Sequence, residues 1–333
     1  MTARAGVHRL RRPQLGRAAT SDADRVTTPH APRLVLRSAA LNEGYSDAEL
    51  ARLVRRRELV PLQRGAYLAE PASTEVVRQR AIVAATVAGL RTGGVIGHAS
   101  AAVLHGLPLW RVPLRRVHLI RPPGSPGSRS ARLHLHLAQL ADDEVTTVDG
   151  VLLTDVARTV VDLARTVSFE CAVVAADAAL ALQATTRDQL AERLSRMGPV
   201  PGTRRAARVV AFADGRSESV GESRSRVLVH HLGLPAPTPQ LRIERPGGGA
   251  LIGRCDLGWE EHRTVGEFDG KVKYGRLLRP GQSAGDAVHA EKLREDELRD
   301  DGWQVTRWTW AELDRPAVIG DRLQRAFRRN SRT

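Results

Sequence analysis

Acidic residues and a lysine recur at alternate positions within residues 254–275. Glu267, Asp269 and Lys271 alternate along the chain, and Asp256 precedes them in the same segment. Alternate side chains of a β-strand point to one face, so a strand here would present these groups together. Carboxylates are the ligands that Mg²⁺ prefers, and a metal ion with an ammonium group stabilises the charge that develops on a phosphate during transfer. The spacing therefore suits a hydrolytic Mg²⁺ site at the end of a hairpin.

Lysine is confined to residues 271–292 of the chain. Lysine and arginine together number 51, yet lysine occurs only at Lys271, Lys273 and Lys292. Lysine is a compact point charge whose pKa shifts readily, whereas arginine stays charged and presents a planar fork. A site can therefore require lysine where a solvent-exposed surface does not. A chance cluster on a solvated face is the alternative.

The composition favours an anionic partner. The chain of 333 residues is long enough for about two or three domains. Its hydrophobic content of 42% is ordinary for a globular protein, and its net charge of +14 most simply indicates binding to nucleic acid. The alternative is an arginine-rich protein whose positive surface reflects genomic bias, without DNA as its ligand.

The cysteine pattern, together with the lack of an apolar signal core or a membrane-length apolar run, predicts a cytoplasmic protein. Cys171 and Cys255 lie in apolar patterns without metal-ligand spacing, as expected for a reducing compartment. The apolar run Ala81–Leu90 is too short to span a membrane, so no membrane partner is expected. Residues 1–31 are basic and lack the apolar core of a secretory signal. We predict that they form a disordered basic tail.

Residues 32–72 carry the signals of a winged helix-turn-helix. Ser46 and Glu49 form a capping-box pattern before a helix that has Leu50 on its apolar face, and residues 59–68 follow as a hairpin. A basic helix of this kind enters the major groove of DNA, and the hairpin contacts the backbone. The predicted DNA-binding residues are Arg52, Arg55, Arg56, Arg57 and Arg64. A helical hairpin with a solvated arginine face is the alternative.

Residues 75–215 are predicted to form a mixed α+β middle domain. Two helices, two strands and a hairpin that turns at Asp149-Gly150 precede four further helices. His134 and His136 share a strand face, but no acid or cysteine is spaced to complete a metal site, so we interpret them as a polar strand face. Arg158 and Asp162, four residues apart, are most simply a surface salt bridge.

Residues 217–329 show the order αβββαβ. A helix over 217–232 places Glu218 and Glu222 on one face, and three strands follow up to Asp269. A charged helix then spans Asp286–Asp301, where Gly302 ends it, and a strand and a closing helix complete the segment. This order predicts a single layered α/β unit.

This C-terminal segment resembles the PD-(D/E)XK nuclease superfamily, and within it the very-short-patch-repair-like endonuclease domains. The resemblance rests on Glu222 in the first helix, Asp256 at a strand end and residues 267–271 in the next strand. It implies that Asp256 and Glu267, with the neighbouring Asp269, bind Mg²⁺ or Mn²⁺. It also implies that Glu222 positions water or metal and that Lys271 stabilises the phosphorane or orients the water.

The segment departs from the superfamily pattern in two respects. The signature is an acid, any residue and then lysine, which Asp269-Gly270-Lys271 matches literally. The strand phase nevertheless makes Glu267 the better acid, and Asp269 then stands where lysine is usual. Cys255 replaces the proline of the PD motif.

The front of the chain resembles the AbiEi-type antitoxins of type IV toxin–antitoxin systems. The resemblance rests on residues 46–67, which end in Arg64-Gly65-Ala66-Tyr67, on the helix His98–Ala102, and on residues 151–163. It implies a DNA-binding winged helix joined to a middle domain, a role in transcriptional autoregulation, and a cognate toxin as partner.

The sequence therefore predicts an α/β multidomain protein with a winged helix-turn-helix, a mixed α+β middle domain and a C-terminal αβββαβ restriction-endonuclease-like domain. The leading function is that of a DNA-binding protein with a Mg²⁺-dependent phosphodiesterase of the endonuclease type, within a toxin–antitoxin or defence system. The alternative is a non-catalytic, antitoxin-like transcriptional regulator that uses a degenerate nuclease fold for binding or dimerisation.

Overall fold

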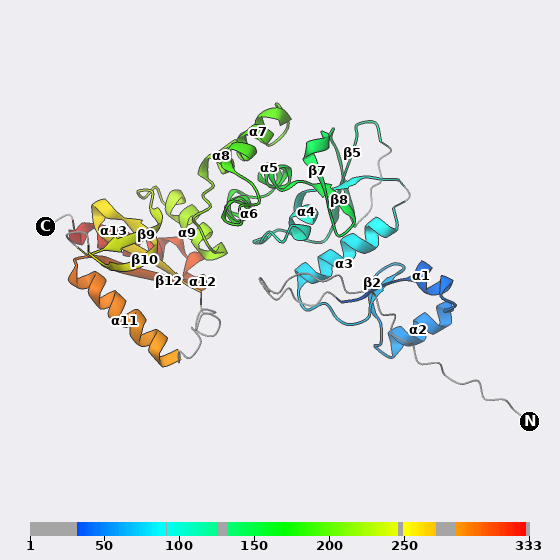
Figure 1. Ribbon diagram of the computed structural model, residues 1–333, viewed down its shortest axis with the longest axis horizontal. Helices are drawn as coiled ribbons and strands as arrows, with labels where there is room; N and C mark the ends of the chain where they lie inside the picture. Colours follow the sequence, from blue (N-terminus) through cyan, green and yellow to red (C-terminus); the bar gives the residue numbers. More distant parts are fainter. Residues whose placement is uncertain (1–31, 91, 126–131, 246–248, 271–283, 331–333) are drawn as a thin grey trace, which may run out of the picture.

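The protein is a mixed α/β structure, which confirms the predicted α/β class. The computed structural model describes residues 32–90, 92–125, 132–245, 249–270 and 284–330. Within these residues the strands form three sheets of three, five and four strands (Figure 1). No helix in the described ranges is long and apolar enough to cross a membrane.

The first sheet holds a short helical pair against a hairpin. Its strands lie in the order β1-β3-β2, and two helices stand between β1 and β2 along the chain. The elements are β1 (Leu34–Leu36), α1 (Arg37–Asn42), α2 (Asp47–Arg55), β2 (Val60–Gln63) and β3 (Ala66–Leu68). The predicted capping box is confirmed, because the Ser46 side chain accepts from the Glu49 amide and the Glu49 carboxylate accepts from the Ser46 amide. Gly65 turns the hairpin with φ +75°.

The packing of this unit continues into the next one. Leu50 lies in a small cluster with Ala40 and Leu59 between α1 and α2. The hairpin residues Leu62 and Leu68 belong instead to a larger cluster that includes α3 (Glu75–Ala88). The hairpin region therefore packs against the α1–α2 pair on one side and against α3 on the other.

The second sheet has the order β6-β5-β4-β8-β7. Its strands are β4 (Val95–Ile96), β5 (Val117–Arg121), β6 (Leu133–Leu137), β7 (Val145–Val148) and β8 (Val151–Thr154), and α4 (His98–Leu104) follows β4. The predicted turn at Asp149-Gly150 is confirmed, with φ of +51° and +75° at its two residues. The two-residue strand β4 was not predicted, although it joins the two halves of the sheet.

Four consecutive helices cover the region between this sheet and the C-terminal sheet (Figure 1). They are α5 (Val156–Thr166), α6 (Phe169–Ala181), α7 (Arg187–Met197) and α8 (Thr203–Phe212). Their shared core consists largely of alanine and valine, and it also takes in Val227 from α9 (Val220–His231). Small side chains allow these helices to approach closely.

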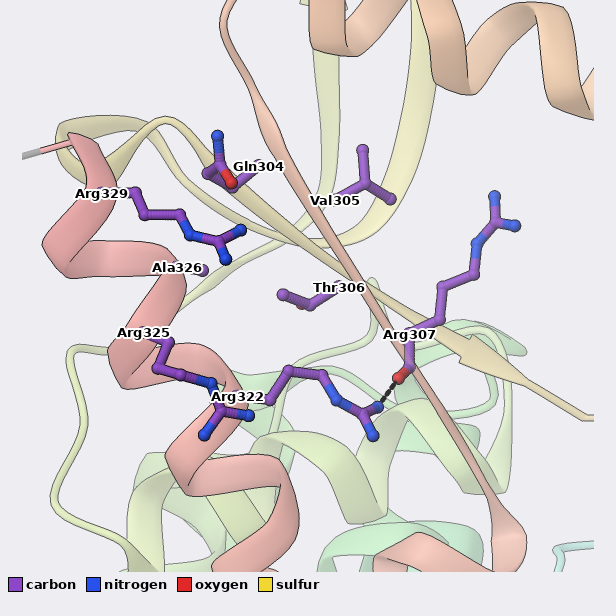
Figure 2. Close-up of a pocket in the computed structure, with 8 residues that line it drawn as sticks. All are labelled: Gln304, Val305, Thr306, Arg307, Arg322, Arg325, Ala326 and Arg329. Atoms are coloured by element: carbon purple, nitrogen blue, oxygen red, sulfur yellow. Dashed lines mark hydrogen bonds between the residues drawn. The ribbon is translucent and has the colours of Figure 1, made fainter.

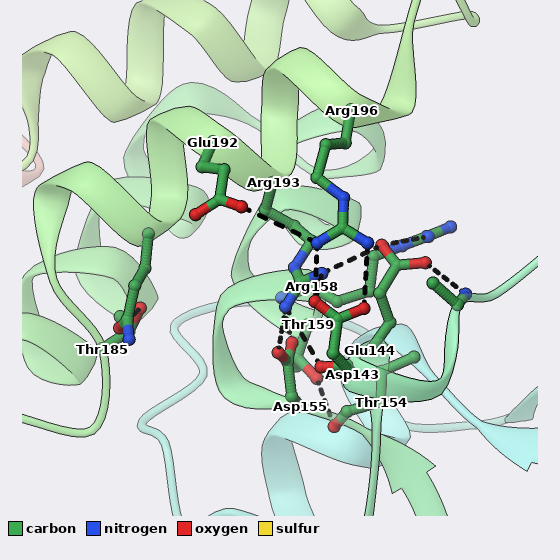
Figure 3. Close-up of polar contacts among 12 residues, drawn as sticks. Asp143, Glu144, Thr154, Asp155, Arg158, Thr159, Thr185, Glu192, Arg193 and Arg196 are labelled. Atoms are coloured by element: carbon green, nitrogen blue, oxygen red, sulfur yellow. Dashed lines mark hydrogen bonds and ion pairs between the residues drawn. The ribbon is translucent and has the colours of Figure 1, made fainter.

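Arg158 and Asp162 form a buried ion pair, and the expectation of a surface salt bridge is wrong. Figure 3 shows the Arg158 guanidinium among the acidic side chains that surround it, with Glu144 as one partner. Arg158 is 4% exposed and Asp162 is 1% exposed. The guanidinium also pairs with the buried Glu144 at 2.9 Å, and burial raises the pKa of Asp162. Sequence spacing shows that two side chains can meet on a helix, but it does not show that the next layer covers them.

The C-terminal elements follow the predicted order. After α9 come β9 (Thr238–Glu244), β10 (Leu251–Trp259), β11 (Thr264–Asp269), α11 (Ala284–Asp300), β12 (Gln304–Thr309), α12 (Trp310–Leu313) and α13 (Pro316–Asn330). The sheet order is β12-β11-β10-β9. Strand β11 is parallel to β12, whereas β10 is antiparallel to both β11 and β9. Glu218 was expected to lie on the first helix, but that helix is capped by Ser219 and Glu218 precedes it.

Two apolar clusters hold this sheet between helices. One packs Leu257, Phe268 and Trp308 against α9, α12 and α13. The other packs Cys255 and Val265 with Leu298 of α11. Helices therefore cover both faces of the sheet. Asp256 was predicted at a strand end, but it lies inside β10, as Glu267 lies inside β11, because both strands continue past these residues; only Asp269 ends its strand.

Candidate functional site

Asp256 and Glu267 lie on neighbouring antiparallel strands. The register pairs Leu257 with Gly266, so the two acids stand one residue further along the same strand pair. The Asp256 carboxylate accepts a hydrogen bond from the amide of Phe268 at 2.8 Å. The hairpin predicted from the sequence thus brings together the two residues expected to bind metal.

Glu267 is held by two arginines. Its carboxylate is 2.7 Å from the Arg294 guanidinium of α11 and 2.9 Å from the Arg307 guanidinium of β12, with one oxygen directed at each. Glu291 pairs with both arginines. These contacts raise the pKa of Arg294 despite the opposing effect of its burial. Both guanidiniums therefore stay charged beside the candidate metal ligand.

Glu222 binds the start of its own helix and the neighbouring strand. One carboxylate oxygen accepts from the Ser219 hydroxyl at 2.7 Å, and the other accepts from the Glu218 amide and the Gln240 side chain. Its side chain is buried. These contacts satisfy orphan donors at the helix N-terminus, so in this arrangement Glu222 positions α9 against β9.

The remaining predicted residues extend the same strand. Asp269 ends β11 and is half-buried, whereas Lys271 lies outside the described residues. Among the described residues, no three carboxylates bring donor atoms within 4.8 Å of one another. The donor set of Asp256, Glu267 and Asp269 fits a magnesium ion in chemical type, since all three offer carboxylate oxygen. The arginine pairs of Glu267 compete with such an ion.

This competition gives a testable expectation. We expect Arg294→Gln to strengthen Mg²⁺ or Mn²⁺ binding about tenfold, because it removes a positive charge in contact with the Glu267 carboxylate. Calorimetric titration measures the change. Arg299→Gln is the matched control, since Arg299 lies on the same helix and pairs with Glu295. Equal affinities in the wild type and the Arg294 variant would show that Glu267 binds no cation.

The predicted DNA-binding arginines all face solvent. Arg52, Arg55, Arg56 and Arg57 are exposed on α2 and the turn after it, while Leu50 on the same helix is buried. Arg64 is exposed at the tip of the β2–β3 hairpin. Within the described ranges, the ion pair formed by this set is a 3.7 Å contact between Arg52 and Glu49. The structure therefore gathers these charges on one helix and one hairpin.

A second basic surface was missed from the sequence. A pocket of about 420 Å³ lies between β12 and α13, and Figure 2 shows Arg322, Arg325 and Arg329 directed toward it from the helix. Arg322 is also paired with Glu312 at 2.6 Å. The signal was present in the spacing of these arginines, which places them on one side of a helix. Guanidinium forks of this kind suit phosphate or carboxylate ligands.

These features define a mixed α/β protein with a buried acidic hairpin and two basic surfaces. No known protein family matches the chain as a whole or in part. The chain is 30% identical over 159 residues to the uncharacterized proteins Rv2248 and MT2308 of two Mycobacterium tuberculosis strains, a match that covers 47% of this chain and 55% of each relative. The chain thus spans about half the length of the curated relatives it matches.

A distant structural similarity was also found. The crystal structure of the RV2827C protein from Mycobacterium tuberculosis is 18% identical and has a TM-score of 0.36, over 65% of this chain and 85% of that chain. A similarity this low does not assign a fold.

Proposed function

We propose that this protein binds DNA through an N-terminal winged helix-turn-helix and carries a PD-(D/E)XK nuclease-like domain at its C-terminus. The observation that carries the proposal is the group of exposed arginines on α2 and the β2–β3 hairpin, Arg52, Arg55, Arg56, Arg57 and Arg64. A basic helix followed by a basic hairpin suits insertion into the major groove with a backbone contact beside it. Neutralising phosphates in this way releases counterions and provides affinity.

The C-terminal part of the proposal rests on topology and on the acidic hairpin. The succession of α9, three strands, α11 and a further strand has the αβββαβ order on which the PD-(D/E)XK resemblance rests. Asp256 and Glu267 stand side by side on β10 and β11, where they would hold Mg²⁺ with Asp269. The ion would supply charge stabilisation to a phosphate under attack by water. Lys271 remains the predicted partner of that phosphate.

A non-catalytic regulator is the second candidate. It is favoured by the double ion pair of Glu267 with Arg294 and Arg307, which satisfies a residue that a nuclease uses for metal. In this case the nuclease-like fold would serve binding or dimerisation, and the protein would act as an antitoxin-like repressor with a cognate toxin. Both candidates require DNA binding and differ only in metal-dependent cleavage.

DNA binding is tested by charge removal. We expect replacement of Arg52, Arg55, Arg56 and Arg57 by glutamine to weaken binding to duplex DNA and to reduce the salt slope of log K by about 3 to 4 if each arginine neutralises one phosphate. Fluorescence anisotropy at several salt concentrations measures both quantities. The control replaces four exposed arginines on scattered surfaces, Arg78, Arg204, Arg242 and Arg299, which gives the same net charge. Equal losses in the two proteins would mean that only overall charge matters.

Cleavage is tested separately. Wild-type protein is incubated with plasmid DNA and with RNA in the presence of Mg²⁺ or Mn²⁺, beside the double variant Asp256→Ala, Glu267→Ala. Cutting by the wild type that disappears in the double variant, with DNA affinity retained, supports the nuclease. DNA binding without cutting by either protein supports the regulator.

A further inference from the structure

Three histidines from separate segments meet at one edge of the five-stranded sheet. His98 begins α4, His118 lies on β5 and His136 lies on β6. One ring nitrogen from each lies within 4.8 Å of the other two, and these are the only three potential ligands that gather so closely among the described residues. His118 Nδ1 and His136 Nε2 are 2.9 Å apart. We call this group the histidine cluster.

The cluster differs from what the sequence indicated. His134 and His136 were interpreted as a polar strand face, and His134 is indeed exposed. His136 instead stacks on His98, with ring centroids 3.8 Å apart. The parallel pairing of β5 with β6 sets His118 beside His134 and therefore diagonal to His136. His98 and His118 could not be assigned to this group from local spacing, because a chain reversal separates them.

The backbone at His98 is held in an unfavourable conformation. Its φ is +52°, in the left-handed region that residues other than glycine rarely adopt. The preceding Gly97 has no room for a side chain, since an added Cβ would lie 2.5 Å from the Ile120 side chain. Close packing therefore forces this strand-to-helix turn and fixes the imidazole beside His118 and His136. Strain of this kind is often found at functional residues.

The His98 ring is also buried without full hydrogen bonding. Its exposed fraction is 4%, and its Nδ1 has no hydrogen-bond partner among the described residues. A buried polar atom left without a hydrogen-bond partner is destabilising unless a ligand satisfies it. Burial lowers the pKa of His98 to about 2, that of His118 to about 4 and that of His136 to about 3, with the neighbouring imidazoles adding to the effect.

The cluster opens into a pocket. A cavity of about 410 Å³ is lined by the three histidines and by His134, together with Arg115 and Arg116. Three protein ligands and one open position are typical of catalytic zinc sites, whereas structural zinc sites are closed by four. The nearby arginines place positive charge around the cavity, which favours an anion over neutral water as a further ligand.

We propose that His98, His118 and His136 form an open site for a divalent transition metal, best suited to Zn²⁺, whose free position faces the Arg115–Arg116 pocket and accepts hydroxide or another small anion. Neutral imidazole is a preferred ligand of Zn²⁺, whereas Mg²⁺ prefers oxygen. Zn–N bonds of about 2.1 Å place two ligands of a tetrahedral ion roughly 3.4 Å apart. The three nitrogens lie within 4.8 Å of one another and would have to shift to reach that separation. This site is independent of the proposed DNA-binding and nuclease-like parts.

The test is a titration of the full-length, metal-stripped protein with Co²⁺ and Zn²⁺. We expect one Co²⁺ per chain, with the visible absorption of a four-coordinate ion, and displacement by Zn²⁺. His98→Asn and His136→Asn are expected to weaken binding by at least about 100-fold. Asparagine is chosen at position 98 because it tolerates positive φ better than most residues. His231→Ala is the control, because His231 is exposed on α9 and does not line the pocket, and this variant should bind as the wild type does.

The wild type alone can overturn the proposal. Absence of a stoichiometric Co²⁺ spectrum would do so. Among the variants, equal losses of affinity in His231→Ala and His136→Asn would also contradict it. If the asparagine variants fail to fold, imidazole NMR signals of the wild type provide the second measurement. Zn²⁺ should shift the signals of three of the 11 histidines, and a shift of none or of a different set contradicts the assignment. Adding phosphate to the Co²⁺ form should change its spectrum if the free position accepts anions of that size, and no change would restrict it to hydroxide or water.

Discussion

Asp177→Ala is expected to lower the free energy of unfolding by about 3–5 kcal/mol, because it leaves a buried arginine without its counter-charge. Asp177 of α6 is 0% exposed, and its carboxylate is 2.7 Å from the Arg226 guanidinium of α9. The same carboxylate accepts a hydrogen bond from the Asp214 amide. Burial raises the pKa of Asp177 even though Arg226 acts in the opposite direction. One substitution thus removes both a charge pair and a backbone contact.

Urea denaturation followed by circular dichroism measures this loss. The control is Arg254→Ala, which removes an ion pair with Glu218 whose side chains are 50% and 52% exposed. Exposed pairs contribute about 0–1 kcal/mol, so this variant should unfold almost as the wild type does. The double variant Asp177→Leu, Arg226→Met should recover much of the loss, because it removes both charges together. Similar destabilisation by Asp177→Ala and Arg254→Ala would contradict a buried, energetically important pair.

This ion pair matters because it joins two parts of the protein. Helix α9 belongs to the C-terminal sheet through Leu228 and Val229, yet its Val227 lies in the core of α5–α8. Arg224 of the same helix pairs with Glu170 on α6 and with Asp314 after α12. The helix that carries Glu222 is therefore fixed from both sides. The C-terminal sheet is consequently attached to the helical region by a packed interface with buried charges.

Local signals in the sequence predicted much of the fold. The Ser46–Glu49 capping box and the Asp149-Gly150 turn depend on residues a few positions apart, and both occur in the structure. The αβββαβ order was predicted for the same reason, since each element has its own apolar periodicity. The adjacency of Asp256 and Glu267 followed from a hairpin, which is the simplest long-range contact to infer.

Contacts between distant segments were not predictable in this way. Strand β4 has two residues, too few to show any periodicity, and it is defined by its neighbours β5 and β8. The partners of Glu267 come from α11 and β12, so its pairing with Arg294 and Arg307 depends on how those elements pack. The histidine cluster likewise depends on the register of β5 with β6. Chemistry that arises from tertiary packing is therefore missed even where each element is correctly predicted.

The contact between Gly221 and Phe268 links the stability of the C-terminal fold to its candidate site. A Cβ built at Gly221 of α9 would lie 2.0 Å from the Phe268 ring of β11. Phe268 stands between Glu267 and Asp269, and it packs edge-on against Trp310. We expect Gly221→Ala to lower the free energy of unfolding by about 2–3 kcal/mol, because overpacking forces the helix and strand apart. The substitution should also weaken cation binding, since it displaces β11, the strand that carries Glu267 and Asp269.

Chemical denaturation and calorimetric metal titration measure the two effects. Gly89→Ala is the matched control, because an added Cβ there meets its nearest atoms at 3.6 Å, an ordinary contact distance. The double variant Gly221→Ala, Phe268→Leu should regain stability, since leucine lacks the ring atoms that occupy the space of the new methyl group. Recovery of both stability and cation binding in the double variant would show that the position of β11 governs the acids. Recovery of stability alone would show that the Phe268 ring itself positions Glu267 and Asp269, and an unaltered Gly221→Ala protein would contradict the close contact.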